Sequence, residues 1–382
     1  MKNPESPSTH PYNQTMLADA IRRVIARQEL SRGEARAALE EILAGAASPA
    51  QIAAFLTGLA MKGETSGELT GFAEAIRAAA APWPGLDAAV DASGTGHEAL
   101  AENPLVDTCG TGGDAAGTFN ISTAAAIVAA GAGLRIAKHG NRSISSRCGS
   151  ADVLEALGVR VDLPPEAAAA CLRETGLAFL FAPRMHGAMK QVQPVRRELG
   201  FRTVFNLLGP LCNPAGARAQ VVGVYAPELT TKMAEALAAL GARRAFVAHG
   251  ADGLDEITTT APTRIAEVRE GSVQTYSLDA RELGLARASL ADLAGGDAAE
   301  NARIITQLLD PQLPADEKTP DGKRLRAQRD ITVLNAAAAL RAANGMESWP
   351  EAIAHARQAL ESGQAQAALR RWAGFRWENS QV

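Results

Sequence analysis

Residues 106–158 decide the fold: VDTCGTGGDAAGTFNISTAAAIVAAGAGLRIAKHGNRSISSRCGSADVLEALG. Glycines, hydroxyls and amides are concentrated at 110–123 and 138–150, and an alanine-rich apolar run, 124–134, lies between them. This order predicts a strand end, a Gly-rich loop, a helix, a strand, a second polar loop and a helix. Both loops should then open at one edge of a sheet, each before a helix N-terminus, where free N–H groups and the helix dipole favour anions. Glycine also lets backbone amides approach a phosphate closely.

The Gly-rich loop has no standard signature of its own. The order Gly-Thr-Gly-Gly-Asp at 110–114 is neither a Walker A loop nor G-x-G-x-x-G, so taken alone it is as consistent with an ordinary turn. Its neighbours favour an anion site, because 120–123 adds hydroxyls at a helix start and 138–142 adds two cations and an amide. The hydroxyls could equally cap the helix, which is compatible with phosphate binding. Lys138 stands at a strand end before a glycine, which argues against a solvated surface lysine, whereas His139 alone is more often a non-catalytic histidine.

Several long motifs together resemble one known family. They are the loops at 110–114 and 120–123, KHGNRSISSRCGSADVLEALG at 138–158, RRELGFRTVFNLLGPLCNP at 196–214 and HGADGLDE at 249–256. In this order they closely resemble the anthranilate phosphoribosyltransferases of tryptophan biosynthesis, and the resemblance extends from about residue 16 to the end of the chain.

The resemblance implies an activity, a cofactor and a set of site residues. The activity is transfer of a 5-phosphoribosyl group from phosphoribosyl pyrophosphate to anthranilate with Mg²⁺, and no obligatory general acid or base is assigned. The implied donor-binding residues are Gly110, Gly113, Asp114, Thr118, Asn120, Ile121, Ser122, Thr123, Lys138, His139, Gly140, Asn141, Arg142, Ser143, Ile144, Ser145, Ser146 and Ser150. The implied anthranilate-binding residues are Gly110, Asn141 and Arg196, and the implied magnesium ligands are Ser122, Asp255 and Glu256.

The residue types fit these roles, although each has a plainer interpretation. Arg196 lies in a cation-rich segment that could be a solvated basic face, and for its other cations we favour that interpretation. A planar guanidinium nevertheless suits a carboxylate bidentately. Gly250 and Gly253 supply the turn that lets Asp255 and Glu256 share one site, and Mg²⁺ prefers one or two carboxylates with phosphate oxygens and water. Without the resemblance, a loop with two solvated acids would be favoured.

Length and composition limit the protein class. The 382 residues allow about two domains, and the net charge of −4 gives no electrostatic case for nucleic acid or an anionic membrane. The four cysteines lack metal-site spacing, so we expect free thiols in the reducing cytosol. No apolar run reaches the ~18 residues that a membrane span needs. Residues 1–15 lack the apolar region of a secretory signal and are expected to form a disordered tail.

The chain divides into a small helical domain and a large α/β domain with a mostly parallel sheet flanked by helices. Residues 16–84 carry three capping boxes and should form the helical domain, completed by part of 183–205. A flexible insertion is expected at 85–104, and the large domain at 105–182 and 206–382, including a polar loop at 311–323. The resemblance implies the fold of the pyrimidine nucleoside phosphorylases and a homodimer formed through the helical domain.

Three other functions compete with this prediction. A nucleoside phosphorylase of the same fold would bind phosphate and a pyrimidine, but the Asn-Ile-Ser-Thr and Asp-Glu motifs favour a magnesium diphosphate. A non-catalytic nucleic-acid-binding relative should lack intact motifs and carry a basic face. A dinucleotide-binding protein should show the G-x-G-x-x-G spacing, which is absent.

Overall fold

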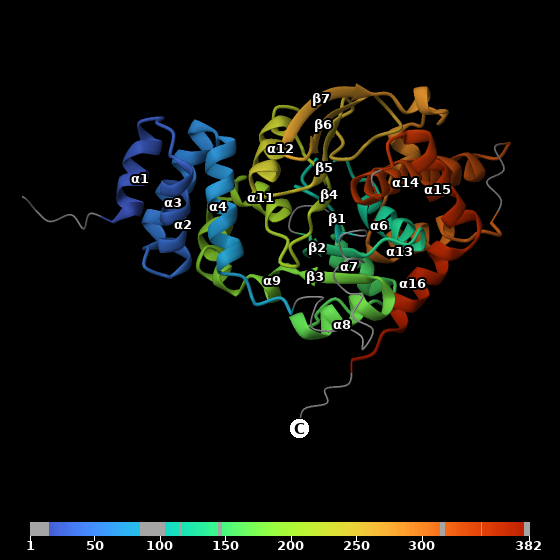
Figure 1. Cartoon of the computed structure of the whole chain (residues 1–382), viewed down its shortest axis with the longest axis horizontal. Coiled ribbons are helices and arrows are strands. Elements are labelled where there is room, and N and C mark those ends of the chain that lie inside the picture. Colours follow the sequence, from blue (N-terminus) through green and yellow to red (C-terminus); the bar gives the residue numbers. More distant parts are fainter. Residues whose placement is uncertain are drawn as a thin grey trace, which may run out of the picture.

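The computed structural model describes residues 15–84, 104–114, 116–143, 147–313, 318–344 and 346–377. Four N-terminal helices lie to one side of a seven-stranded sheet, and the C-terminal helices lie toward its other side (Figure 1). The expected tail and insertion lie outside the described residues except for their last residues. One of these, Thr15, is not part of a tail, because its side chain accepts a hydrogen bond from the Ala18 amide and caps the first helix.

The N-terminal helices begin where the capping motifs predict. They are α1 (Met16–Ile25), α2 (Arg32–Leu43), α3 (Pro49–Lys62) and α4 (Ser66–Ala78). Capping boxes at Ser31, Ser48 and Thr65 open α2, α3 and α4. Gly71 lets α4 lie directly against α2, because a Cβ there would stand 2.2 Å from the Arg32 carbonyl oxygen. These helices are therefore specified locally by their caps, and a shared buried apolar cluster packs them together.

The sheet is mostly parallel, as predicted. Its strand order is β3-β2-β1-β4-β5-β6-β7, with parallel pairs from β3 to β5 and antiparallel pairs from β5 to β7. The strands are β1 (Val106–Gly110), β2 (Ile136–Gly140), β3 (Leu177–Phe181), β4 (Ala219–Gly223), β5 (Arg244–Gly250), β6 (Thr263–Arg269) and β7 (Ser272–Leu278).

Both faces of the central strands are covered. In β5, Ala245 and Val247 join the core on the side of α12 (Leu229–Ala239), whereas Phe246 and Ala248 join the core on the other side. That second core contains α6 (Ile121–Gly131) and α14 (Pro320–Asn344), which pack on each other. Covering on both faces explains why residues 245–248 in β5 are all apolar and do not alternate with polar residues.

The remaining helices surround this sheet. They are α7 (Ser150–Ala156), α8 (Pro165–Thr175), α9 (Ala182–Met185), α10 (Gln193–Leu199), α11 (Phe205–Leu208), α13 (Ala298–Leu308), α15 (Trp349–Glu361) and α16 (Gln364–Gly374), with 3-10 turns η2 (Gly187–Gln191), η3 (Gly209–Leu211), η4 (Ala280–Leu283) and η5 (Leu290–Leu293). None of the described helices is long and apolar enough to cross a membrane.

One predicted loop is too long. The loop expected at 311–323 ends at Thr319, because α14 begins at Pro320. The Thr319 hydroxyl accepts a hydrogen bond from the Gly322 amide, 3.1 Å away, and so caps this helix. A polar, exposed first turn resembles a loop in sequence, which explains the error.

The cation-rich segment after β3 returns to the N-terminal helices. Val192 and Val195, at the start of α10, belong to the same buried cluster as the cores of α1 to α4, and α10 contacts α3. The same cluster continues through α11 and α12 to the sheet. The N-terminal helices are thus joined to the sheet by one continuous apolar core.

Candidate active site

The candidate site lies at the carboxyl ends of the parallel strands. Since β1 and β2 are parallel neighbours, the loops that follow Gly110 and Gly140 open at the same edge of the sheet, as expected. The loop after β5, which carries Asp255 and Glu256, opens there too, because β4 lies parallel between β1 and β5. Ligands of open α/β sheets commonly bind at this edge.

The Gly-rich loop is held by main-chain contacts. The Thr111 amide donates to the Gly223 carbonyl at 2.9 Å, and the Gly112 amide donates to Asp255 Oδ2 at 3.0 Å. Gly112 and Gly113 have φ of +65° and +83°, a region that L side chains rarely adopt. The loop conformation therefore requires glycine at both positions.

Close packing between the strands and the acidic loop also requires glycine. A Cβ on Gly223 would lie 1.5 Å from the Asp255 carbonyl oxygen, and a Cβ on Gly110 would lie 2.9 Å from Asp255 Oδ2. The absence of these side chains lets the Asp255 carboxylate reach the Gly-rich loop from 143 residues away in sequence.

Three carboxylates converge at this point. Glu256 Oε1 accepts a hydrogen bond from the Ser122 amide, 3.1 Å away at the start of α6. Burial, followed by repulsion from Asp114 and Glu256, raises the pKa of Asp255 well above its usual value. Burial also raises the pKa of Glu256 to about 8, although Lys138 opposes the shift. The ionised forms of these carboxyl groups are therefore disfavoured in the site, and a bound cation would stabilise them.

Lys138 lies inside β2 and not at its end. Its side chain is buried, and Nζ donates to the Thr108 carbonyl and to Ser122 Oγ, the latter at 3.3 Å. Burial lowers the pKa of Lys138. The prediction that this lysine is not a solvated surface group is thus confirmed, but its cation faces Ser122 from beneath the Gly-rich loop.

The His139 ring is not brought to this group. Successive residues of a strand point to opposite faces, so His139 faces away from the side of Lys138. Its Nδ1 lies 3.1 Å from the Gly209 carbonyl oxygen, and its ring meets the His186 ring edge-on at 5.0 Å. Only the backbone of His139, and not its ring, can therefore contribute to the predicted donor loop.

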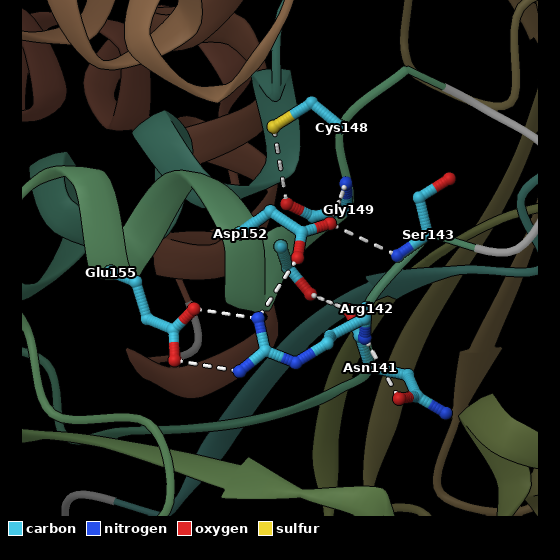
Figure 2. A network of polar contacts seen from close by, with 8 residues as sticks. Asn141, Arg142, Ser143, Cys148, Gly149, Asp152 and Glu155 are labelled. Atoms are coloured by element: carbon cyan, nitrogen blue, oxygen red, sulfur yellow. Dashed lines mark hydrogen bonds and ion pairs between the residues drawn. The ribbon is translucent and has the colours of Figure 1, made fainter.

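The second polar loop is closed by an acidic residue of α7 (Figure 2). Asp152 Oδ2 accepts hydrogen bonds from the amides of Ser143 and Gly149, at 3.1 and 2.8 Å. Arg142 pairs with Glu155 at 2.6 Å and with Asp152 at 3.2 Å, so its guanidinium is directed to these acids. Of the predicted donor-binding residues, Ile144, Ser145 and Ser146 lie outside the described residues.

Asn141 and Ser150 join the two ends of this loop. Ser150 Oγ donates to the Asn141 carbonyl oxygen at 3.3 Å, and Asn141 Oδ1 accepts from the Arg142 amide at 2.8 Å. The structure thus places Asn141 at the carboxyl end of β2, directly after Gly140, with its side chain folded against the next amide.

The residues around the start of α6 mainly connect neighbouring segments. Asn120 Nδ2 donates to the Cys148 carbonyl at 3.3 Å, and Asn120 Oδ1 accepts from Asn301 Nδ2 at 2.9 Å. Thr118 forms an isolated bridge with Ala294, and the side chains of Ile121 and Thr123 are buried. Asn120 and Thr118 thus connect the start of α6 to the second polar loop and to the segment before α13, and Ser122 contacts both Glu256 and Lys138.

The guanidinium of Arg196 is half-buried and lacks an acidic partner within the described residues. Arg196 belongs to α10, and its guanidinium carbon lies 5.3 Å from the centre of the Phe205 ring. Burial lowers its pKa, and no hydrogen bond or ion pair to its guanidinium occurs within the described residues. The neighbouring Arg197 is exposed. A half-buried cation without an acidic partner favours Arg196 over Arg197 as the carboxylate-binding residue.

Arg202 is a site residue that the sequence analysis missed. Its Nη2 donates to the Gly113 carbonyl, and its guanidinium carbon lies 4.2 Å from the centre of the Tyr225 ring. The Tyr225 amide in turn donates to Thr111 Oγ1 at 3.2 Å, so both residues hold the Gly-rich loop. The sequence pattern groups Arg202 with the surface cations, because no local signal reveals a contact across 89 residues.

The comparisons with known proteins agree along almost the whole chain. Residues 102–366 match the model "Glycosyl transferase family, a/b domain", and residues 18–80 match "Glycosyl transferase family, helical bundle domain". The chain is 52% identical over 354 residues to an anthranilate phosphoribosyltransferase of Moorella thermoacetica, covering 93% of this chain and 96% of the relative.

Two solved structures extend the likeness. A crystal structure of the anthranilate phosphoribosyltransferase from Thermus thermophilus has a TM-score of 0.80 and 43% identity, covering 93% of this chain and 98% of that one. The enzyme from Saccharomyces cerevisiae, in complex with PRPP and Mg, has a TM-score of 0.78 and 27% identity, covering 96% and 99%.

Proposed function

Because the chain belongs to the anthranilate phosphoribosyltransferase family, we propose that it transfers the 5-phosphoribosyl group of phosphoribosyl pyrophosphate to anthranilate. The products are N-(5-phosphoribosyl)anthranilate and pyrophosphate. The observation that carries this proposal is the convergence of the Gly-rich loop, the start of α6 and the carboxylates of Asp255 and Glu256 at one sheet edge.

The donor is bound by the two loops. The amides and hydroxyls of 110–114 and 120–123 receive the diphosphate, supported by the N-terminus of α6 and by Lys138 beneath Ser122. The residues at 138–150 complete this donor site. As pyrophosphate leaves the anomeric carbon, positive charge develops on the sugar and negative charge on the leaving group. These groups therefore act mainly by orientation and by stabilising the departing anion.

The acidic loop fits a magnesium ion. Among the described residues, no group of three or more His, Cys, Asp and Glu side chains is arranged to hold a metal by itself. Mg²⁺ commonly binds one or two carboxylates together with substrate phosphates, and the raised pKa values of Asp255 and Glu256 mark carboxyl groups whose ionised form such an ion would stabilise. Asp255 and Glu256, with Ser122, would hold it. When bound, the ion supplies charge neutralisation for the diphosphate.

Anthranilate is recognised through its carboxylate. Arg196 supplies a half-buried guanidinium without an acidic partner within the described residues. Gly110 ends β1, and Asn141 directly follows β2, its parallel neighbour. An arylamine is nucleophilic when neutral and loses its proton readily once it is alkylated. The reaction therefore needs no obligatory general base, and positioning of the amine is the main requirement.

Release of pyrophosphate tests this function. The purified chain with phosphoribosyl pyrophosphate and Mg²⁺ should release pyrophosphate rapidly when anthranilate is present and very slowly without it. Phosphorolysis of a pyrimidine nucleoside, measured in parallel, would instead indicate the related phosphorylase activity. Absence of both activities in a folded preparation would favour the non-catalytic alternative.

We also propose a homodimer through the helical domain, which comprises residues 16–84 and is completed by part of 183–205. Ile25 and Met61 on α1 and α3 are 64% and 66% exposed, which supports burial of this surface in a partner. Light scattering of Ile25→Glu should then report monomers where the unmodified chain reports dimers.

The four free cysteines support a reducing compartment, the cytosol.

A further inference from the structure

A cationic cavity lies at the amino end of β4, whereas the candidate active site lies at the carboxyl ends of the parallel strands. It has a volume of about 340 Å³ and is lined by Arg77, Gly216, Ala217, Arg218, Gln220, Leu240, Gly241 and Ala242. Arg218 directly precedes β4, whereas Gly223, at the far end of that strand, contacts the acidic loop. Five residues of strand separate the two ends, about 16 Å at 3.3 Å per residue. The cavity is therefore distinct from the loops that we assign to the substrates.

We propose that this cavity is a second binding site, for a small dianion such as a dicarboxylate or a phosphate monoester. The site joins the N-terminal helices to the sheet, because Arg77 belongs to α4 and Arg218 and Gln220 belong to β4 and its approach. Occupation would thus stabilise the contact between the helical unit and the large domain. This proposal goes beyond the transferase activity and does not depend on it.

Two arginines supply the charge. Arg77 Nε donates to the Leu211 carbonyl at 2.7 Å and Nη1 to the Leu240 carbonyl at 3.4 Å. Arg218 Nε donates to the Gly241 carbonyl at 3.0 Å. No acidic side chain is among the residues that line the cavity, and burial lowers the pKa of Arg77. Glu74, which raises the pKa of Arg77 through its charge, is itself paired with Arg32.

Capping of α12 does not account for both arginines. Leu240 and Gly241 follow the last residues of α12, so each guanidinium satisfies a carbonyl at that helix end. A helix C-terminus carries about half of a negative charge, whereas the two arginines carry two positive charges. More than one positive charge therefore remains at the cavity, on the exposed Arg218 and on Arg77, and no acid is among the lining residues.

A buried amide also lines the cavity. Gln220 is 1% exposed, and its Nε2 donates to the Pro210 carbonyl at 2.9 Å. Its Oε1 is buried, so a ligand in the cavity does not reach it, and the two arginines set the charge that a ligand needs. A small dicarboxylate and a phosphate monoester both meet this requirement.

Calorimetric titration of the full chain tests the site. The probes are sodium L-malate and sn-glycerol 3-phosphate, each against sodium chloride of equal ionic strength. We expect at least one probe to bind saturably with one site per chain, and Arg218→Gln to weaken it by about tenfold or more, because a charge-assisted hydrogen bond is lost. The stronger probe identifies whether the carboxylate or the phosphate form is preferred.

Matched variants separate this site from the active site. Arg173→Gln removes an exposed cation from α8 and should leave binding of the probe unchanged. Phosphoribosyl pyrophosphate should bind Arg218→Gln as it binds the unmodified chain, which shows that the donor loops are intact. Failure of both probes to bind saturably, or equal binding by Arg218→Gln and the unmodified chain, would overturn the proposal. A chain that binds the probe but lacks transferase activity would contradict only the proposed function.

Discussion

Replacement of Arg196 by alanine tests how the acceptor is recognised. The guanidinium is half-buried over Phe205, and no acid contacts it within the described residues. An incoming carboxylate would therefore gain a charge-assisted contact that no protein group already satisfies. We expect Arg196→Ala to weaken anthranilate binding selectively.

The magnitude follows from the type of contact. A hydrogen bond to a charged group contributes about 1.5–3 kcal/mol, and each 1.4 kcal/mol corresponds to a factor of ten. The KM for anthranilate should therefore rise roughly 10- to 150-fold, or kcat/KM should fall equally. The cation–π contact with Phe205 contributes about 0.5–1 kcal/mol to the fold, and loss of a desolvated charge offsets part of this. The melting temperature should change little.

The assay is steady-state kinetics with each substrate varied in turn. The KM for phosphoribosyl pyrophosphate should change far less than that for anthranilate, because the donor binds at the loops after β1 and β2. Arg197→Ala is the control, since Arg197 is the exposed neighbour on the same helix. A selective anthranilate defect in Arg197→Ala but not in Arg196→Ala would refute our reasoning from burial, and equal, negligible effects would make the segment an ordinary surface.

Three further predictions concern the metal, the loop and the dependence of stability on pH. Asp255→Asn combined with Glu256→Gln should abolish Mg²⁺-dependent turnover. The melting temperature of the metal-free protein should not fall, because the raised pKa values already favour neutral carboxyl groups and the amides have the same shape; normal turnover at limiting Mg²⁺ would contradict the assignment. Gly113→Val should weaken phosphoribosyl pyrophosphate binding about tenfold or more by calorimetry, since φ is +83° and the new Cβ would lie 2.8 Å from Arg202 Nη2; unchanged affinity would mean that the loop is only a turn. Burial lowers the pKa of His186 to about 4 in the folded chain. Below about pH 6.5 this histidine is therefore protonated in the unfolded chain but not in the folded chain, and stability is lost as the pH falls toward 4. Between pH 7 and pH 5, the free energy of unfolding measured with urea should fall by about 2 kcal/mol less in His186→Gln than in the unmodified chain. Equal decreases would show that His186 does not cause the pH dependence.

Local physics explains what the sequence determined by itself. The capping boxes at Ser31, Ser48 and Thr65 use residues three positions apart, so the starts of three helices can be read without a tertiary structure. The alternation of strands and helices after residue 105 likewise predicts a mostly parallel sheet. Parallel strands then require that the loops at 110–123 and 138–150 share one edge, which places the candidate donor site. The role of Arg196 is implied by the resemblance of its motif, and it remains the residue that we favour for binding the carboxylate of anthranilate.

The tertiary structure decided which of these residues touch one another. Asp255 reaches Gly112 across 143 residues, and Arg202 reaches Gly113 across 89, because missing Cβ atoms and strand order bring distant loops together. Lys138 and His139 are adjacent in sequence, yet the two-residue repeat of a strand directs one to Ser122 and the other to Gly209. Such contacts depend on burial, register and charge compensation between segments, and these quantities exist only once the chain has folded.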